Sequence, residues 1–469
     1  MNFKSDDLPF VPVTELTKLY ANRDVSPVEV VNACVQRIET YNAKINAFTL
    51  IDYQGAQRAA ADSEARWSKK QPQGLLDGVP FTVKDNLMVS GYPFRRGSLV
   101  TPDNPVNEDA PIVARCREAG GIFVGLTTMP EFGVGAVTIS PLTGVTRNPW
   151  DVRKQSGGSS GGAAAGLAAG FCNFALGSDA GGSIRIPAAL TGVVGLKPSA
   201  GRVPMYPASA AGTLSCNGPL TRRVADAAFL LSLAAQSDPR DGMAGLTHAT
   251  NYSASPNENI TGLRVATSET LGYAPLVDPE IVAAFKNAVK LFDKLGAIVT
   301  AEDLDIQDPI TTYLTLLRAG YQFSLRNIAV HDKERLSPPI QEIVFEQKPI
   351  TLVEYLQALE QCQLLARRFH SFHSRYDVLL TPTVAAPAFA AERYYPEDYE
   401  KFSNRRAWTP FTAIFNLTGQ PAITVPMALT SKGLPIGLQI VGARGAEIMI
   451  LKAAAAFEKA NNFTQRPSL

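Results

Sequence analysis

The chain has 469 residues, with 44 Lys and Arg against 43 Asp and Glu, so its formal charge is +1 with histidine neutral. This balance lacks the basic excess that favours nucleic-acid binding, and a hydrophobic fraction of 45% excludes an intrinsically disordered chain. The five cysteines are odd in number and form no C-x-x-C pair, which argues against a disulfide framework and a zinc knuckle. We therefore expect a globular protein of a reducing compartment that does not bind nucleic acid.

No segment of the sequence is expected to enter a membrane. The first residues lack the charged and then apolar order of a secretory signal. The longest uncharged stretch, 155–178, would be long enough to span a bilayer, but Gly and Ser dominate its first half and cannot form a continuous apolar helix. We expect a cytoplasmic protein without a membrane partner.

Helices and strands alternate along the first half of the chain. Ser26, Pro27 and Glu29 form a capping box that opens a helix. The further predicted elements are a helix at 54–69, a strand at 79–83, a helix capped by Asp109 that ends at Glu118, a strand at 122–126, a helix at 163–169, a strand at 173–176 and a helix at 221–235. The order strand, helix, strand between 79 and 126 indicates a βαβ unit.

The alternation resumes after a polar, turn-rich segment at 239–259, which we expect to be a surface loop. The predicted elements that follow are a strand at 263–267, a helix at 278–295, strands at 377–380, 423–426 and 437–441, and a helix at 446–460. Because helices and strands mix to both ends, we predict one large α/β domain with an open mixed sheet covered by helices. Its expected parts are an N-terminal helical layer (1–70), a core with the catalytic residues (75–235) and a C-terminal part that completes the sheet and the substrate pocket (260–469).

Two glycine loops carry serines, Ser-Gly-Gly-Ser-Ser-Gly-Gly at 156–162 and Gly-Ser-Asp-Ala-Gly-Gly-Ser-Ile-Arg at 177–185. Glycine permits positive φ and close backbone approach, and consecutive N–H groups at such turns bind anions. A phosphate-binding P-loop is disfavoured, because the first loop is followed by Ala163 instead of Lys and Ser or Thr. One such loop could be a flexible spacer, but two loops separated by a core-like helix and strand indicate a site that stabilises negative charge.

Serine chemistry in these loops needs a base. The chain has four histidines, all far from both loops in sequence: His248, His331, His370 and His373. The last two lie three apart on a helix-like run without a carboxylate motif, so a solvated helical face is favoured over a metal site. Lys84 ends a buried strand, where desolvation lowers a lysine pKa. A structural lysine paired with Asp77 or Asp85 is the alternative.

The segments DGVPFTVKDN, GGSSGG and DAGGSIRIPA, followed by GLKPSAGRVP, resemble the amidase signature family in sequence, spacing and order. The resemblance runs from about Pro27 to the C-terminal segments GQPAITVP and LPIGLQIVG. It implies a Ser-cisSer-Lys triad, with Ser183 as the nucleophile, Ser159 after a cis peptide bond and Lys84 as the base. The implied oxyanion hole consists of the backbone N–H groups of Ala180, Gly181, Gly182 and Ser183. The resemblance implies no metal and no organic cofactor.

The resemblance implies an amide hydrolase that works through an acyl-enzyme. Lys84 would take a proton from Ser159 while Ser159 takes one from Ser183, and Ser183 would attack the amide carbonyl. The glycine-turn N–H groups would stabilise the oxyanion, and water would then release the acid. Asp179 and Arg185 flank the nucleophile and are expected to shape its loop.

The family contains stand-alone amidases and the glutaminase subunit of the glutamyl-tRNA(Gln)/aspartyl-tRNA(Asn) amidotransferase, which is the alternative function. In that glutaminase the ammonium group of the amino acid is held by an aspartate, and counting back from GQPA places Thr409 there in this chain. Tyr206, Trp408 and Phe411 are candidate aromatic residues of the substrate pocket, with core packing as the alternative. We expect a small, uncharged amide as the substrate, while the choice between monomer and homodimer stays open.

Overall fold

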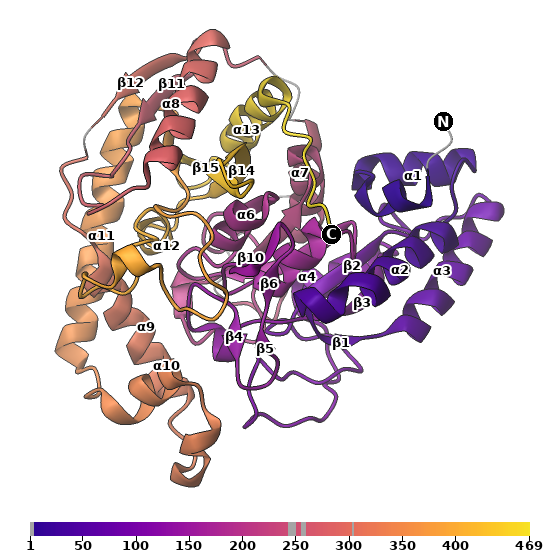
Figure 1. Ribbon diagram of the computed structural model, residues 1–469, viewed down its shortest axis with the longest axis horizontal. Coiled ribbons are helices and arrows are strands. Elements are labelled where there is room, and N and C mark those ends of the chain that lie inside the picture. The colour runs from indigo at the N-terminus through magenta and orange to yellow at the C-terminus, as the bar shows by residue number, and fades with distance from the viewer. Residues whose placement is uncertain (1–3, 243–249, 255–258, 303) are drawn as a thin grey trace.

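One large sheet runs through the molecule, and helices cover it along its length (Figure 1). The computed structural model describes residues 4–242, 250–254, 259–302 and 304–469. The α-helices are α1 Val13–Asn22, α2 Pro27–Ile45, α3 Tyr53–Ser68, α4 Pro111–Glu118, α5 Gly161–Ala168, α6 Arg185–Thr191, α7 Val224–Ala234, α8 Pro279–Lys294, α9 Ile310–Ser324, α10 Pro338–Gln341, α11 Leu352–Arg375, α12 Ile414–Leu417 and α13 Glu447–Asn461.

The sheet has 11 strands in the order β1-β3-β2-β8-β10-β9-β14-β15-β13-β11-β12. Their bounds are β1 Phe48–Ile51, β2 Pro80–Lys84, β3 Ile122–Thr127, β8 Phe174–Asp179, β9 Val194–Lys197, β10 Cys216–Thr221, β11 Arg264–Thr267, β12 Ile298–Ala301, β13 Val378–Pro382, β14 Ala422–Leu429 and β15 Pro435–Gly442. Two small hairpin sheets pair β4 Ile139–Ser140 with β5 Gly144–Val145 and β6 Arg147–Asn148 with β7 Asp151–Gln155. Parallel and antiparallel pairs both occur in the large sheet, which confirms the predicted mixed α/β fold.

The predicted βαβ unit is present, because β2 and β3 are parallel neighbours joined through α4. The capping box that opens α2 is also present, with Ser26 and Glu29 each accepting the other's backbone N–H. The predicted cap of α4 is wrong. Its N-cap is Ala110, while the carboxylate of Asp109 accepts the Ser90 N–H and a guanidinium N–H from Arg117.

The uncharged stretch 155–178 forms part of the protein interior. It contains the end of β7, the helix α5 and most of β8, and every residue of α5 is buried. Small side chains let this helix pack closely, as the leucine and alanines of α5 share a cluster with Ile184 and Leu220. In the part of the chain that the structure describes, no helix has the length and apolar composition needed to cross a bilayer.

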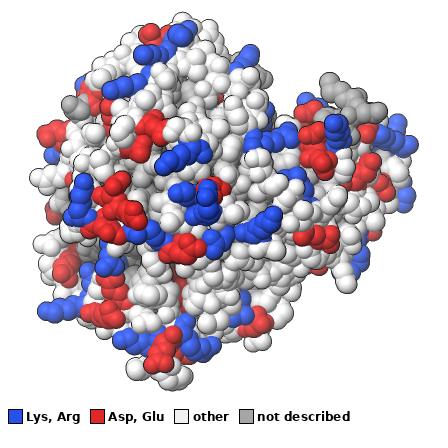
Figure 2. Space-filling view, in the orientation of Figure 1, with Lys and Arg blue, Asp and Glu red and all other residues white. Residues whose placement is uncertain are grey.

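The N-terminal helices α1 to α3 and the helices α8 and α11 lie at opposite ends of the molecule (Figure 1). The middle of the sheet, with β2, β8 and β10, lies between these ends. On the face seen in Figure 2, basic and acidic side chains are interspersed, in line with the formal charge of +1. Of the loop predicted at 239–259, residues 243–249 and 255–258 lie outside the described residues.

Candidate active site

The strands β2 and β8 lie side by side and parallel, with Val83 opposite Leu176. Because parallel strands end at the same edge of a sheet, Lys84 at the end of β2 comes next to Ser178 near the end of β8. Lys84 Nζ donates to Ser178 Oγ at 3.0 Å and to Ser159 Oγ at 2.7 Å. The predicted base and the first glycine loop therefore meet directly.

The two glycine loops are joined by hydrogen bonds. The Ser160 N–H donates to the carbonyl oxygen of Ser183 at 3.0 Å, and Ser160 Oγ donates to the carbonyl oxygen of Ser178 at 3.2 Å. The peptide bond between Gly158 and Ser159 is cis. Ser159 and Ser183 are 2% and 8% exposed, so both hydroxyl-bearing residues lie in a site largely closed to bulk water. The structure thus brings together the two serines that lie on separate loops in the sequence.

Lys84 is fully buried, and its surroundings differ from those of an ion-paired lysine. Burial lowers its pKa to about 7, with the nearby charge of Asp179 acting in the opposite direction. Asp77 pairs instead with Arg66, and Asp85 accepts backbone N–H groups. A lysine with this pKa is partly neutral near pH 7 and can accept a proton.

A buried carboxylate holds the second glycine loop in shape. Asp179 accepts the Gly182 N–H at 2.7 Å and the Ile184 N–H at 3.1 Å, and it pairs with the fully buried Arg185 at 2.9 Å. Burial alone would raise the pKa of Asp179, but the charge and hydrogen bonds of Arg185 outweigh it and hold the pKa below its ordinary value. Asn416 Nδ2 also donates to this carboxylate. The flanking charges act on the loop, as expected.

The oxyanion loop differs from expectation at Gly182, because its N–H is already used by Asp179. Within the described part of the chain, the N–H groups of Ala180, Gly181 and Ser183 have no acceptor. Gly181 cannot carry a side chain, since a Cβ would lie 2.3 Å from the Tyr313 hydroxyl oxygen. Three backbone donors next to the nucleophile position are thus available to an oxyanion.

A cavity opens beside Ser178 and Asn86, and Tyr206 lines it. The other two candidate aromatics lie elsewhere. Trp408 and Phe411 are 1% and 0% exposed and belong to a core cluster of aliphatic and aromatic side chains. For these two residues core packing is the better interpretation, and neither lines this cavity.

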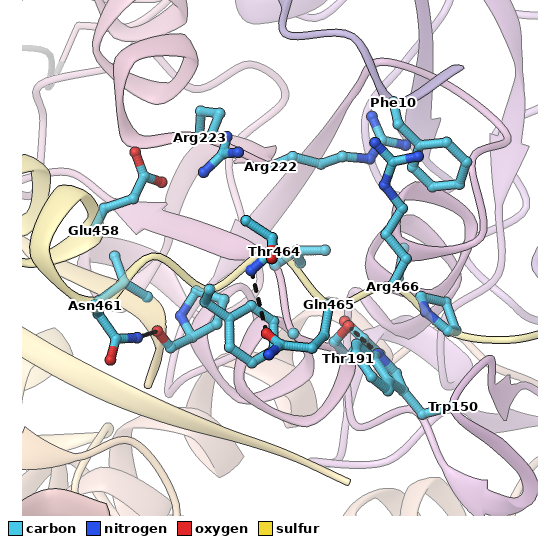
Figure 3. A pocket seen from close by; sticks show the side chains of 17 residues that line it. Phe10, Trp150, Thr191, Arg222, Arg223, Glu458, Asn461, Thr464, Gln465 and Arg466 are labelled. Carbon is cyan, nitrogen blue, oxygen red and sulfur yellow. Dashed lines mark hydrogen bonds between the residues drawn. The ribbon is translucent and has the colours of Figure 1, made fainter. Parts of the chain in front are cut away.

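A second cavity lies between the body of the protein and its C-terminal segment, as Figure 3 shows. None of the predicted site residues lines it. Its most buried cation, Arg222, donates to the carbonyl oxygens of Leu167 and Cys172 and so holds the chain rather than a ligand. The predicted solvated histidine face is wrong in part. His370 is exposed, but the ring of His373 contacts the Gln420 amide and the Tyr376 carbonyl.

Several residues of the site were missed by sequence reasoning. Ser178 accepts from both Lys84 and Asn86, although all three lie inside the motifs already singled out. A strand end next to the lysine-bearing strand was the available signal. Thr412 Oγ1 donates to the Gly181 carbonyl, but no pattern in the sequence links Thr412 to the glycine loops.

Comparison with known proteins agrees with this geometry. The amidase family profile matches residues 29–451. The chain belongs to the amidase family. It is an amide hydrolase and acts on C–N bonds, as the recognised motifs implied.

Three similar proteins illustrate the range of this amidase family. An acylamidase of Rhodococcus erythropolis is 35% identical, with 96% of each chain covered. The glutamyl-tRNA(Gln) amidotransferase A-chain component of Myxococcus xanthus is 34% identical over 96% of this chain and 97% of its own. The crystal structure of a bacterial aryl acylamidase of the amidase signature family superimposes with a TM-score of 0.88, at 27% identity and 96% coverage of each chain.

Proposed function

We propose that this amidase works without a partner protein and that Ser183, Ser159 and Lys84 are its catalytic triad. The observation that carries the proposal is the 2.7 Å contact between Lys84 Nζ and Ser159 Oγ in a buried site. Such a contact is short enough for direct proton transfer, and the lowered pKa of Lys84 gives it a fraction of neutral amine at neutral pH.

In the proposed reaction the neutral amine of Lys84 accepts the Ser159 proton, and Ser159 accepts the proton of Ser183. The Ser183 oxygen then bonds to the amide carbon, and the oxyanion is stabilised by the N–H groups of Ala180, Gly181 and Ser183. Collapse of this intermediate breaks the C–N bond while Ser159 returns a proton to the leaving nitrogen. Water attacks the acyl-enzyme through the same relay and frees the acid.

The proposal of a stand-alone enzyme rests on Thr409, which occupies the place that the glutaminase subunit gives to an aspartate. Its hydroxyl donates to the Arg406 carbonyl at 3.1 Å and the residue is buried. An ammonium group brought there would lack a carboxylate partner, which disfavours free glutamine as the substrate. The similarity to the amidotransferase component keeps that function as the alternative.

Two measurements test this proposal. A fluorophosphonate is expected to label the purified protein at Ser183, and Ser183→Ala is expected to remove both the label and the turnover of aryl and alkyl amides. Labelling that persists at the same peptide in Ser183→Ala would refute the assignment of the nucleophile. Efficient glutamine hydrolysis that increases with charged tRNA and partner proteins, without turnover of simple amides, would favour the amidotransferase function.

A further inference from the structure

The cavity beside Ser178 contains an unpaired cation. Among the described residues that line it, Arg96 is the only charged one. Its guanidinium lies 5.3 Å from the Phe94 ring centre and 4.9 Å from that of Phe132. In the described part of the chain this guanidinium has neither a hydrogen bond nor an ion pair, and its Nε is buried without a partner.

Other arginines near this cavity are neutralised. Arg240 lies over the Tyr206 ring, yet it pairs with Asp238 at 2.8 Å. Arg95, the neighbour of Arg96 in the chain, pairs with Asp103 at 2.8 Å. Burial lowers the pKa of Arg96, although a guanidinium stays charged at any physiological pH. A charge left unpaired among aromatic rings is costly, and an anion in the cavity would offset that cost.

The cavity lies next to the place where the leaving nitrogen must be. A Cβ at Gly133 would lie 3.6 Å from Ser159 Oγ and 3.7 Å from the Tyr321 hydroxyl oxygen. Tyr321 donates to the carbonyl of Phe132 at 2.7 Å, and both residues line the cavity. In the proposed mechanism Ser159 delivers the proton to the leaving nitrogen, so that nitrogen lies on this side of the site.

Resting on the proposed function, we infer that Arg96 binds a carboxylate on the amine portion of the substrate, so that the products are an acid and an amino-carboxylic acid. The carboxylate would accept N–H groups of the guanidinium, while the rings of Phe94, Phe132 and Tyr206 contact the carbon frame between carboxylate and nitrogen. The bond changes are those of amide hydrolysis, and the carboxylate takes no part in them. This inference replaces the expectation of an uncharged amide, whose aromatic basis was Trp408 and Phe411.

Two substrates of similar shape test the inference. Para-acetamidobenzoate carries the carboxylate, and para-acetamidotoluene has a methyl group in its place. We expect the wild-type kcat/KM to favour the carboxylate by about tenfold or more, as a charge-assisted hydrogen-bonded pair would give. Arg96→Gln is expected to remove this preference with little change for the toluene, and Arg96→Lys to restore part of it. Arg95→Gln is the matched control, because it removes one positive charge from the same loop but outside the cavity.

Protection of Ser183 from fluorophosphonate labelling provides a readout that needs no turnover. The benzoate should protect wild type and Arg95→Gln at lower concentration than it protects Arg96→Gln. Equal protection by both compounds, no protection by the benzoate, or an equal loss for both substrates in Arg96→Gln would overturn the inference. If Ser183→Ala still turned over either substrate, the proposed function itself would fail, so the two failures are distinguishable.

Discussion

Lys84 and Lys197 are both fully buried lysines at the ends of strands, yet their surroundings differ. Burial lowers the pKa of each. Lys84 Nζ contacts two serine hydroxyls, whereas Lys197 Nζ donates to the Pro198 carbonyl at 2.9 Å and lies 3.9 Å from Cys216 Sγ. A hydroxyl can pass a proton onward, and a carbonyl cannot. Burial therefore makes a lysine able to be neutral, but its neighbours decide whether it can act as a base.

The largest expected effect separates the two lysines by activity. Lys84→Ala should lower kcat/KM for any good amide substrate by about 10²- to 10⁴-fold, the usual contribution of a general base. Lys84→Arg should be as inactive, because a guanidinium does not release its proton. Steady-state kinetics with circular dichroism of each folded variant measures this. Near-normal turnover by Lys84→Arg would move the base to another group.

The pH dependence gives the second test. As pH falls below about 7, Lys84 becomes protonated and can no longer accept the Ser159 proton, so kcat/KM should fall. The fall should approach tenfold per pH unit well below this pKa, and the rate should level off above it. A buffer series with a neutral amide measures the profile. A rate that stays constant from about pH 5 to about pH 7 would contradict a base with this pKa.

Ser178→Ala should have a smaller effect, about tenfold in kcat/KM, as expected when one hydrogen bond to a charged group is lost. The variant keeps the contact between Lys84 and Ser159 but removes the second hydroxyl that accepts from Lys84 Nζ. Because that hydroxyl favours the charged amine, its loss should also move the acid limb of the pH profile to lower pH. An unchanged limb would show that Ser178 does not influence Lys84.

Lys197→Met should have the smallest effect, with kcat/KM within about threefold of wild type, since Lys197 contacts no residue of the proposed relay. Replacing a buried amine by an apolar side chain of similar length should leave the melting temperature unchanged or raise it. Calorimetry and kinetics on the same preparation test both statements. A loss of activity as large as that of Lys84→Ala would end the distinction between the two lysines.

Much of the fold could be predicted because local signals agreed with it. The capping box at Ser26 and Glu29 marked α2, and the strand signals around Val83 and Leu126 marked a parallel pair. Asp109 carried a cap-like signal too, but tertiary hydrogen bonds use its carboxylate. The 24-residue helix α11 was missed, although Thr351 begins a capping box there that has the same form as the one that opens α2.

The catalytic residues were accessible to sequence reasoning, and the cavity was not. Lys84 and Ser183 lie in motifs whose residue types have a chemical reason to be there. Arg96 stands beside Arg95 in the sequence, and only the fold shows that one is paired while the other faces aromatic rings. Trp408 shows the opposite case, because an aromatic residue near a suspected pocket looks the same in sequence whether it binds a ligand or fills the core.

The pairing of β2 with β8 makes enzymatic activity a reporter of correct strand alignment. Thr82 lies opposite Ala175 and Val83 opposite Leu176, and this alignment sets Lys84 beside Ser178. Side chains alternate between the two faces of a strand, so a slip by one residue would turn Lys84 to the other face while leaving the strand content unchanged. Protein recovered from denaturant could then show native-like circular dichroism in a misaligned fraction, and only its specific activity would reveal that fraction.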